Sequence, residues 1–283
     1  MNRLPFEKRK QIIHLMVEGN GINAISRLTG ASKNTVLKLL GEAGEACMAH
    51  HDRAVRGVKA NRVECDEIWS FNYCKKANLA KAKAAPEGAG DVWTWTAIDV
   101  DSKLIVSYLI GGRDADAAQD FMHDVADRLA NRVQLTTDGH GAYLSAVLGA
   151  FGIDVDYAQL VKHYGPTADL AGPERKYSPG RFVSANKRRV IGKPIKSLVS
   201  TSYVEKHNQT MRQHMKRFSR LTAAHSKKID NHVAMVALYT CWYNFARINS
   251  AVRMSPAMAC GLEQRLWDIG DIVKLIEASE TNQ

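Results

Sequence analysis

The stretch RVECDEIWSF (62–71) decides the fold class, because it begins a run of strands. Its apolar and β-branched residues predict a strand, and two further β-rich runs follow, VWTWTAIDV (92–100) and LIVSYLI (104–110). The short link DSK (101–103) between those two runs predicts a hairpin. Three strands in succession before any helix indicate a sheet that opens as a meander.

After the hairpin, the sequence alternates between helical and extended patterns. The spacing of apolar residues predicts helices over 114–129 and 142–151, and β-rich runs predict strands over 133–137 and 153–161. Strands interleaved with helices after a meander predict an α/β domain with a mixed sheet. Near the C-terminus the pattern predicts further helices over three ranges: 200–220, 231–248 and 262–277.

The first 40 residues predict three short helices joined by turns that contain glycine. Ser32 is a natural N-cap for the third of them. The pattern is typical of a helix-turn-helix, in which the residues after the N-cap reach DNA. The exposed side chains expected to contact phosphates or base edges are Lys33, Asn34, Thr35 and Lys38. The alternative is a helical bundle used for dimerisation, with its polar face in solvent.

Composition favours a nucleic-acid partner and excludes several other classes. The 283 residues include 39 Lys and Arg against 29 Asp and Glu, a formal net charge of +10. A basic surplus of this size favours a polyanionic partner. With 45% hydrophobic and 24% charged residues, a mostly disordered chain is excluded. No stretch approaches the ~18 apolar residues of a membrane span, and no export signal is recognised, so we expect a cytoplasmic protein.

The five cysteines carry no metal or disulfide signature. None of them has CxxC spacing, which argues against a structural zinc site and a disulfide framework. Cys47 with His50 and His51 could suggest a ligand cluster, but polar residues on a linker or helix surface are the better interpretation, since no second ligand pair lies nearby.

Residues 162–197 interrupt the α/β pattern. Prolines and glycines exclude long regular elements there, and the segment is strongly basic, with Arg188 and Arg189 among its cations. A loop longer than ~15 residues inside a compact domain is usually functional or disordered. We therefore expect a basic insertion that contacts DNA phosphates; a solvated surface insertion is the alternative.

Three acidic residues stand where chemistry could be done. Asp66 lies within a strand, where a charge is costly to bury, and Asp138 ends a strand, where α/β sheets place ligands. Glu205 begins a helix face that continues through Arg212 and Lys216, and these two cations are expected to hold the phosphate backbone of DNA. Each acid alone could be a turn, cap or dipole residue. Together, two carboxylates on adjacent strands and one on a following helix can hold Mg²⁺, and two ions ~4 Å apart can clamp a phosphoryl transfer.

Neighbouring titratable residues are expected to play other parts. Alternation along the strand directs Glu67 to the face opposite Asp66. Turn roles are expected for Asp99 and Asp101, helix capping for Asp114 and Asp116, and surface or second-layer roles for His140 and His207.

The order Asp66, Asp138, Glu205, with Arg212 seven residues after the glutamate, resembles the DDE transposases and integrases of the RNase H-like superfamily. The resemblance is closest to bacterial insertion-sequence transposases of the insertion-sequence-one type. Six ordered blocks carry it, from about residue 60 to residue 262: VECDEIWSF, DVWTWTAIDVDSKLI, GGRDADAAQDFM, LTTDGHGAYLSAV, TSYVEKHNQTMRQHMKRFSRLT and MSPAMACGL. Some relatives carry a cysteine-rich finger before their helix-turn-helix. This chain has none, so its N-terminal DNA contacts would differ.

The resemblance implies an RNase H-like catalytic domain and a reaction. The expected domains are a helix-turn-helix (1–45), a linker (46–61), the catalytic domain with its basic insertion (62–250) and a helical tail (251–283). Asp66 would bridge two Mg²⁺ or Mn²⁺ ions, Asp138 would bind one and Glu205 the other, and Arg212 would contact DNA. Hydrolysis at a transposon end would free a 3′-OH, which would attack a target phosphodiester without ATP. The implied partners are the duplex DNA of transposon ends and target, bound by a dimer or higher oligomer in the bacterial nucleoid.

Two other functions fit part of the sequence. A DNA-binding regulator whose α/β domain senses a ligand would explain the charge and the N-terminus, but it leaves the mid-strand aspartate without a cause. A related nuclease acting on RNA–DNA hybrids would share the fold, and the N-terminal module argues against it.

Overall fold

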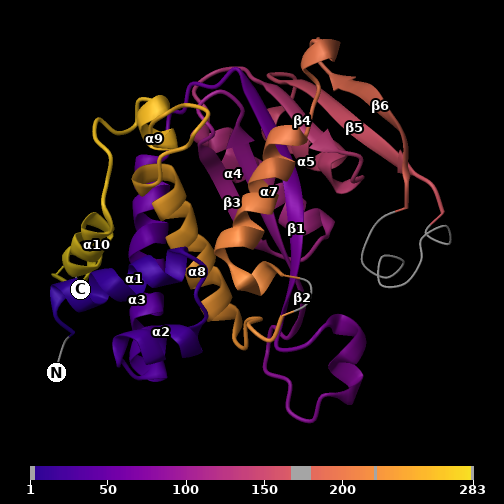
Figure 1. Ribbon diagram of the computed structural model, residues 1–283. Coiled ribbons are helices and arrows are strands. Elements are labelled where there is room, and N and C mark those ends of the chain that lie inside the picture. The colour runs from indigo at the N-terminus through magenta and orange to yellow at the C-terminus, as the bar shows by residue number, and fades with distance from the viewer. Residues whose placement is uncertain (1–3, 167–179, 220–221, 282–283) are drawn as a thin grey trace.

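The computed structural model describes residues 4–166, 180–219 and 222–281. Figure 1 shows a twisted sheet beside a group of packed helices, with helix α7 crossing one face of the sheet and helices α4 and α5 lying on the other. The prediction of an α/β fold with a mixed sheet is confirmed. None of the described helices is long and apolar enough to cross a membrane.

The sheet has six strands in the order β3-β2-β1-β4-β5-β6. Strands β1, β2 and β3 form an antiparallel meander, β4 and β5 run parallel to β1, and β6 returns antiparallel to β5. This arrangement is compatible with an RNase H-like fold. The bounds are β1 (Arg62–Asn72), β2 (Gly90–Asp99), β3 (Ile105–Gly111), β4 (Gln134–Asp138), β5 (Asp156–Tyr164) and β6 (Phe182–Ile191).

Strand β1 occupies the centre of the sheet. It pairs with β2 on one side and β4 on the other, and none of its residues is exposed. Its acidic residues are therefore charged groups in the interior of a sheet, which need hydrogen bonds or a counter-charge nearby. The sequence block that begins the meander is thus also the block that carries the buried charge.

Three helices cover the sheet: α4 (Ala115–Arg128), α5 (Ala142–Phe151) and α7 (Ser202–His214). The Asp114 carboxylate caps α4 by accepting a 3.0 Å hydrogen bond from the backbone N–H of Ala117, as predicted. Helix α7 has no cap from its own N-cap side chain. Instead Glu64 of β1 accepts hydrogen bonds from the backbone N–H groups of Tyr203 and Val204 at 2.8 and 3.1 Å. Strand β1 therefore fixes where α7 begins.

The N-terminal helices are α1 (Phe6–Val17), α2 (Ile22–Thr29) and α3 (Lys33–Ala54). Ser32 caps α3 through a 3.1 Å bond from the Thr35 N–H, as predicted. Residues 46–54, expected to be part of a linker, are instead the second half of α3. The helix continues because one of its faces, with Ala46 and Cys47 on it, is buried against α8 (Ile229–Cys241). The role of these helices in DNA binding stays a prediction.

The crossing of α3 and α8 depends on Gly44. A Cβ atom at this position would lie 2.5 Å from the Cα of Ala234, closer than any side chain tolerates. Gly44 lies within α3 and permits the close approach of two helices. The glycine thus serves tertiary packing instead of terminating the helix.

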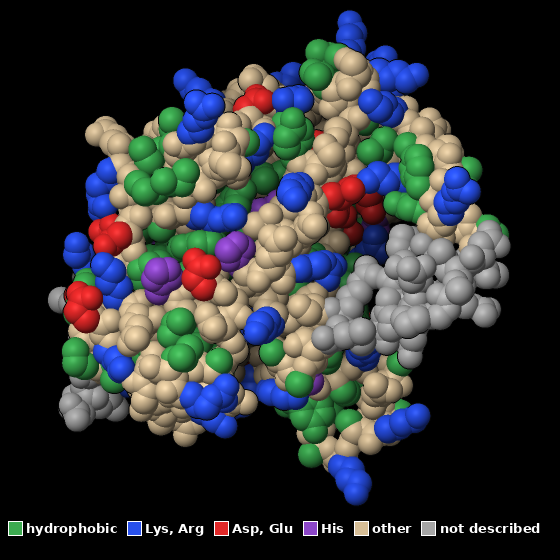
Figure 2. Space-filling model, viewed as in Figure 1, with side chains coloured by type: hydrophobic (Ala, Val, Ile, Leu, Met, Phe, Trp, Pro, Cys, Tyr) green, Lys and Arg blue, Asp and Glu red, His purple; other side chains and the backbone are tan. Residues whose placement is uncertain are grey.

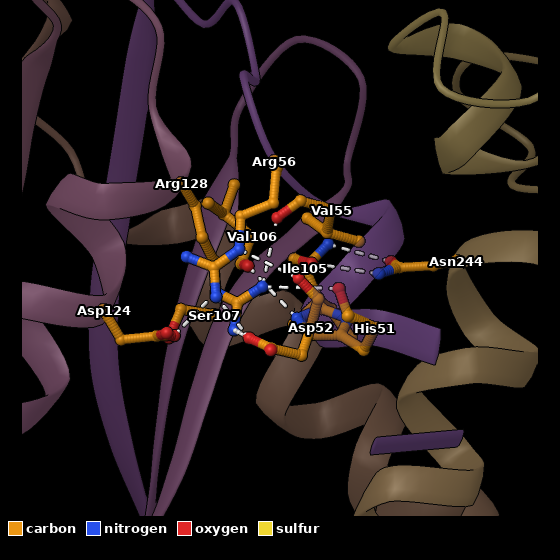
Figure 3. A network of polar contacts seen from close by, with 10 residues as sticks. All are labelled: His51, Asp52, Val55, Arg56, Ile105, Val106, Ser107, Asp124, Arg128 and Asn244. Carbon is orange, nitrogen blue, oxygen red and sulfur yellow. Dashed lines mark hydrogen bonds and ion pairs between the residues drawn. The ribbon is translucent and has the colours of Figure 1, made fainter. Parts of the chain in front are cut away.

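A polar network ties the end of α3 to the sheet (Figure 3). The Arg128 guanidinium, at the end of α4, donates to the backbone carbonyls of His51 and Val55 at 3.3 and 3.0 Å and pairs with Asp124 at 2.7 Å. Edge strand β3 is sealed by Asn244, whose amide exchanges two 2.9 Å hydrogen bonds with the backbone of Ile105. The end of α3 is therefore joined to α4 through Arg128, and it reaches β3 through a 3.2 Å hydrogen bond between the His51 ring nitrogen Nε2 and the Val106 carbonyl oxygen.

The prediction that 162–197 is irregular is wrong for most of its described residues. Strand β5 continues to Tyr164, and β6 pairs with it over 182–191. Most β6 side chains are exposed, so this strand needs no apolar alternation and its pattern was hidden by its charges. Residues 167–179, the middle of the expected arm, lie outside the described residues.

The C-terminal region is helical, as predicted, with shifted bounds. Helix α8 passes into a π-helical turn, η5 (Trp242–Ala246), and two further helices follow, α9 (Pro256–Ala259) and α10 (Ile269–Thr281). The helix expected over 262–277 begins later, at 269. Short 3-10 turns complete the chain: η1 (Lys76–Lys81), η3 (Lys196–Leu198) and η4 (Lys216–Phe218).

Candidate active site

Three carboxyl groups converge where β4 ends beside the middle of β1. One oxygen from each of Asp66, Glu67 and Asp138 lies within 4.8 Å of the others. Cys65 of β1 and Thr137 of β4 are paired in register. The residues that follow them, Asp66 and Asp138, therefore lie side by side. Figure 2 shows acidic side chains gathered in a recess beside α7, bordered by lysine and arginine side chains.

Glu67 belongs to this group, which the sequence interpretation did not expect. The alternation itself is correct, because Asp66 bonds to α7 while Glu67 lies beside Tyr143 of α5. The glutamate side chain is almost completely buried, at 1% exposure, yet its carboxylate reaches the other two acids. The length of the glutamate side chain therefore lets its carboxylate reach the other two acids, although its Cβ atom lies on the other face of β1 from that of Asp66.

Glu205 lies on the first turn of α7, beside the group and not within it. Among the described residues, the group with mutual distances under 4.8 Å contains Asp66, Glu67 and Asp138 alone. The Glu205 carboxylate pairs with Lys162 of β5 and accepts a 2.5 Å hydrogen bond from the Thr201 hydroxyl. One turn further along α7, the Asn208 amide donates to Asp66 at 2.9 Å. Helix α7 therefore faces the acids through Asn208 and flanks them with Glu205.

The electrostatics of the group favour a bound cation. Burial raises the pKa of Asp66 to about 7, and the negative charges of Glu67, Asp138 and Glu205 contribute in the same direction. Burial and the charge of Asp138 likewise raise the pKa of Glu67. Carboxylates that disfavour each other's ionisation are stabilised by a positive charge placed among them. The donor set consists of carboxylate oxygens, the ligands that Mg²⁺ and Mn²⁺ prefer, so these residues fit a hard divalent cation.

Arg113 is a site residue that the sequence interpretation missed. Its guanidinium lies 3.2 Å from Glu67 and 3.6 Å from Asp138 and stacks 4.8 Å from the centre of the Trp93 ring. The side chain therefore supplies a positive charge to two of the three acids. In the sequence, Arg113 lies in the block GGRDADAAQDFM, directly before a helix cap. Nothing in this local pattern indicates that its side chain reaches the acids.

The two histidines considered in the sequence have different surroundings. The backbone N–H of His140 donates to Asp138 at 2.9 Å, and the His140 ring nitrogen Nδ1 accepts from the Ala142 N–H at 3.2 Å. His140 thus orients Asp138 through its backbone. His207 lies on the buried face of α7 against Tyr239 and Tyr243, and burial lowers its pKa to about 3.

The residues predicted to contact DNA occupy three regions. Lys33 and Lys216 line one cleft of about 640 Å³ between the N-terminal helices and the end of α7. Asn34 and Lys38 are exposed on α3, and the Lys38 ammonium lies 3.7 Å from the Glu42 carboxylate. The Thr35 hydroxyl shares a 2.8 Å hydrogen bond with the Ser32 hydroxyl. Arg212 is half-buried and donates to the carbonyl of Phe218 at 2.6 Å, and Arg188 and Arg189 are exposed on β6. Their contact with DNA stays a prediction.

Comparisons with known proteins add little to this geometry. No protein-family model matches the chain, and no curated protein matches it significantly. The chain is similar to one in the crystal structure of the Mos1 strand transfer complex, with 12% sequence identity, 85% of this chain and 76% of that chain covered, and a TM-score of 0.24. A TM-score this low carries no argument about fold or function.

Proposed function

We propose that this chain is a metal-dependent DNA transposase of the DDE type, which cleaves the ends of an insertion sequence and joins them to target DNA. The observation that carries the proposal is the convergence of Asp66, Glu67 and Asp138 on a sheet whose strand order is compatible with an RNase H-like fold. The basic surplus of the chain and the residues that resemble DDE transposases support it.

The residues present could hold divalent cations through Asp66 and Asp138, with Glu205 approaching from α7. A bound cation would supply charge stabilisation at the phosphate and a lower pKa for the attacking hydroxyl. Asn208 orients the Asp66 carboxylate, and the backbone of His140 orients Asp138. Glu64 holds the start of α7, so it positions Glu205 relative to β1. These contacts limit the motion of each acid before substrate binds.

A ligand-sensing regulator is a weaker alternative. A ligand-sensing role does not explain why three mutually repelling carboxylates lie together where β4 ends beside β1. Their repulsion destabilises the metal-free fold. A cation-dependent reaction explains this loss of stability, because the bound cation would need the three carboxylates close together.

The test is cleavage of duplex DNA that carries the sequences flanking the reading frame, in Mg²⁺ or Mn²⁺. We expect Asp66→Asn and Asp138→Asn to abolish nicking and leave binding in a gel-shift assay unchanged. Asp154→Asn is the matched control, because that carboxylate is 90% exposed and remote from the group. Strand cleavage by Asp66→Asn at the wild-type rate would show that the metal site is wrongly assigned.

A further inference from the structure

A second concave site lies at the other end of α7 from the acids. The cleft of about 640 Å³ is bounded on one side by the turn between α1 and α2 and by the start of α3. Its other side is formed by the end of α7, by η4 and by the segment leading into α8. The cleft therefore joins the N-terminal helices to the part of the chain that carries Glu205.

The cleft is lined by one sign of charge. Its described lining includes no Asp or Glu, while the cationic or titratable basic residues are Arg27, Lys33, His214, Lys216, Arg217, His225 and Lys227. Like charges facing one hollow repel each other and concentrate positive potential there, which attracts an anion. The lining therefore fits a polyanion.

Three of these cations are available to a ligand. Within the described part of the chain, the side chains of Arg27, Lys33 and Lys216 form no ion pair and no hydrogen bond. The cations nearest the acids and in the C-terminal region differ, because Arg113, Lys162 and Arg265 each have a carboxylate partner. Arg217 is held in the wall by its bonds to Ser226 and Asn231. The cleft thus combines fixed walls with unpaired charges.

The two sides of the cleft are held in place relative to each other. Gly19 has a φ of 77°, and a Cβ atom there would lie 3.0 Å from the carbonyl oxygen of Gln213 near the end of α7. The ring nitrogen Nδ1 of His214 lies 3.0 Å from the carbonyl oxygen of Val17 at the end of α1. Because α1 and α7 touch through backbone and ring, the cleft exists before any ligand binds.

We infer that this cleft binds the sugar-phosphate backbone of duplex DNA, so that one duplex contacts the N-terminal helices and the end of α7 at once. The inference rests on the proposed function for its choice of DNA as the polyanion. Glu205 and His214 lie about 14 Å apart along α7, at roughly 1.5 Å per residue. That span corresponds to about four base-pair steps of roughly 3.4 Å. Helix α7 therefore sets a short, constant distance between the bound backbone and the acids.

The experiment measures DNA affinity without requiring cleavage. A fluorescent DNA duplex is titrated, in the absence of divalent metal, with the full chain carrying Asp66→Asn and then also Arg27→Gln and Lys216→Gln. We expect the double change to weaken binding by about 10-fold or more and to reduce the slope of log K against log salt by about two, one for each lost phosphate contact.

A matched control changes the same charge elsewhere. Lys59 and Lys83 lie outside the cleft, so the variant carrying Lys59→Gln and Lys83→Gln should keep the parental salt slope. Thermal melting of all variants shows whether each is folded. A cleft variant that is folded and binds like the control would overturn the inference, as would tighter binding of an RNA duplex of the same length.

The outcome separates this inference from the proposed function. If the wild-type chain does not cleave DNA but the cleft variant loses affinity, the proposed function fails and the cleft remains a DNA site. If the wild-type chain cleaves and the cleft variant binds and cleaves normally, the proposed function stands and the cleft assignment is wrong.

Discussion

The two ends of α7 present opposite chemistry. At its start, Asp66, Glu67 and Asp138 are crowded together and paired with Arg113 or Asn208. At its end, Arg27, Lys33 and Lys216 face a cleft without any partner among the described residues. Buried charges need a compensating group within the fold. Exposed cations are stabilised by water and remain free to bind a phosphate. Under the proposed function, the first end would carry the reaction and the second would hold DNA.

The change expected to have the largest effect is Glu205→Gln. If α7 brings this carboxylate to the reacting phosphate, the cleavage rate should fall about 1,000-fold, which is about 4 kcal/mol in activation free energy. DNA affinity should stay constant or rise slightly, because a negative charge is lost. Single-turnover cleavage and gel-shift assays measure the two quantities. Glu18→Gln, at an exposed carboxylate after α1, is the control. Equal loss in both assays would contradict the division of labour between the ends of α7.

Arg128→Gln should break the attachment of α3, and with it the fixed relation between the cleft and the sheet. The arginine side chain is 6% exposed and serves two backbone carbonyls and two carboxylates (Figure 3). We expect a loss of about 3 kcal/mol in the free energy of unfolding, measured with urea. Arg56→Gln removes an exposed partner of Asp52 and should cost under about 0.5 kcal/mol. Similar losses in the two variants would show that the buried network is unimportant.

Stability should fall in acid because buried histidines are held neutral. Burial lowers the pKa of His51 and of His207 to about 3, from an ordinary value of 6.5. The unfolded chain takes up these protons below pH 6.5 and the folded chain does not, so stability is complete above that pH and declines as pH falls. At pH 5 each histidine should cost about 2 kcal/mol. Asp66 acts in the opposite direction, because its pKa is raised to about 7 and its protonation in acid relieves the repulsion among the acids. Urea unfolding of the Asp66→Asn variant at pH 7 and pH 5 removes that contribution and measures the loss caused by the histidines.

His207→Phe separates the contribution of this histidine from the rest. Both ring nitrogens of His207 are buried and have no hydrogen-bond partner among the described residues, so phenylalanine fits the same apolar surroundings. The variant should lose less stability between pH 7 and pH 5 than the wild type. A pH dependence identical to that of the wild type would exclude His207 as a source of acid sensitivity.

Arg113→Gln should have the smallest of these effects and should act on metal affinity. The guanidinium competes with a cation for Glu67 and Asp138, so its removal should tighten Mn²⁺ binding about fivefold, near 1 kcal/mol. Calorimetric titration measures the affinity, and Arg113→Lys, which keeps the charge, is the matched control. Weaker Mn²⁺ binding by Arg113→Gln would show that the arginine supports the site.

Much of the fold could be predicted because its signals are local. The meander of β1, β2 and β3 followed from three β-rich runs, and Ser32 and Asp114 cap the helices that they were expected to cap. Strand β6 and the second half of α3 could not be predicted in this way. The first is held by pairing with β5 and the second by burial against α8, and both partners are distant in sequence.

The candidate site divides in the same manner. Asp66 and Asp138 could be singled out, since a mid-strand charge and a strand-end carboxylate are unusual in their own neighbourhoods. The position of Glu205 in the site stays a prediction. Glu67, Arg113 and the capping contact of Glu64 depend on which side chains meet across β1, β4 and α7, and no local pattern carries that information.

The sequence by itself determined the alternation of elements, the helix caps and the acidic residues worth attention, because each depends on residues a few positions apart. Only the tertiary structure decided that Glu67 joins the acids, that Gly44 permits a helix crossing, and that Arg27 and Lys216 face one cleft. The physical reason is that the free energy of a charge or a close contact depends on neighbours in space, and folding brings those neighbours from remote parts of the chain.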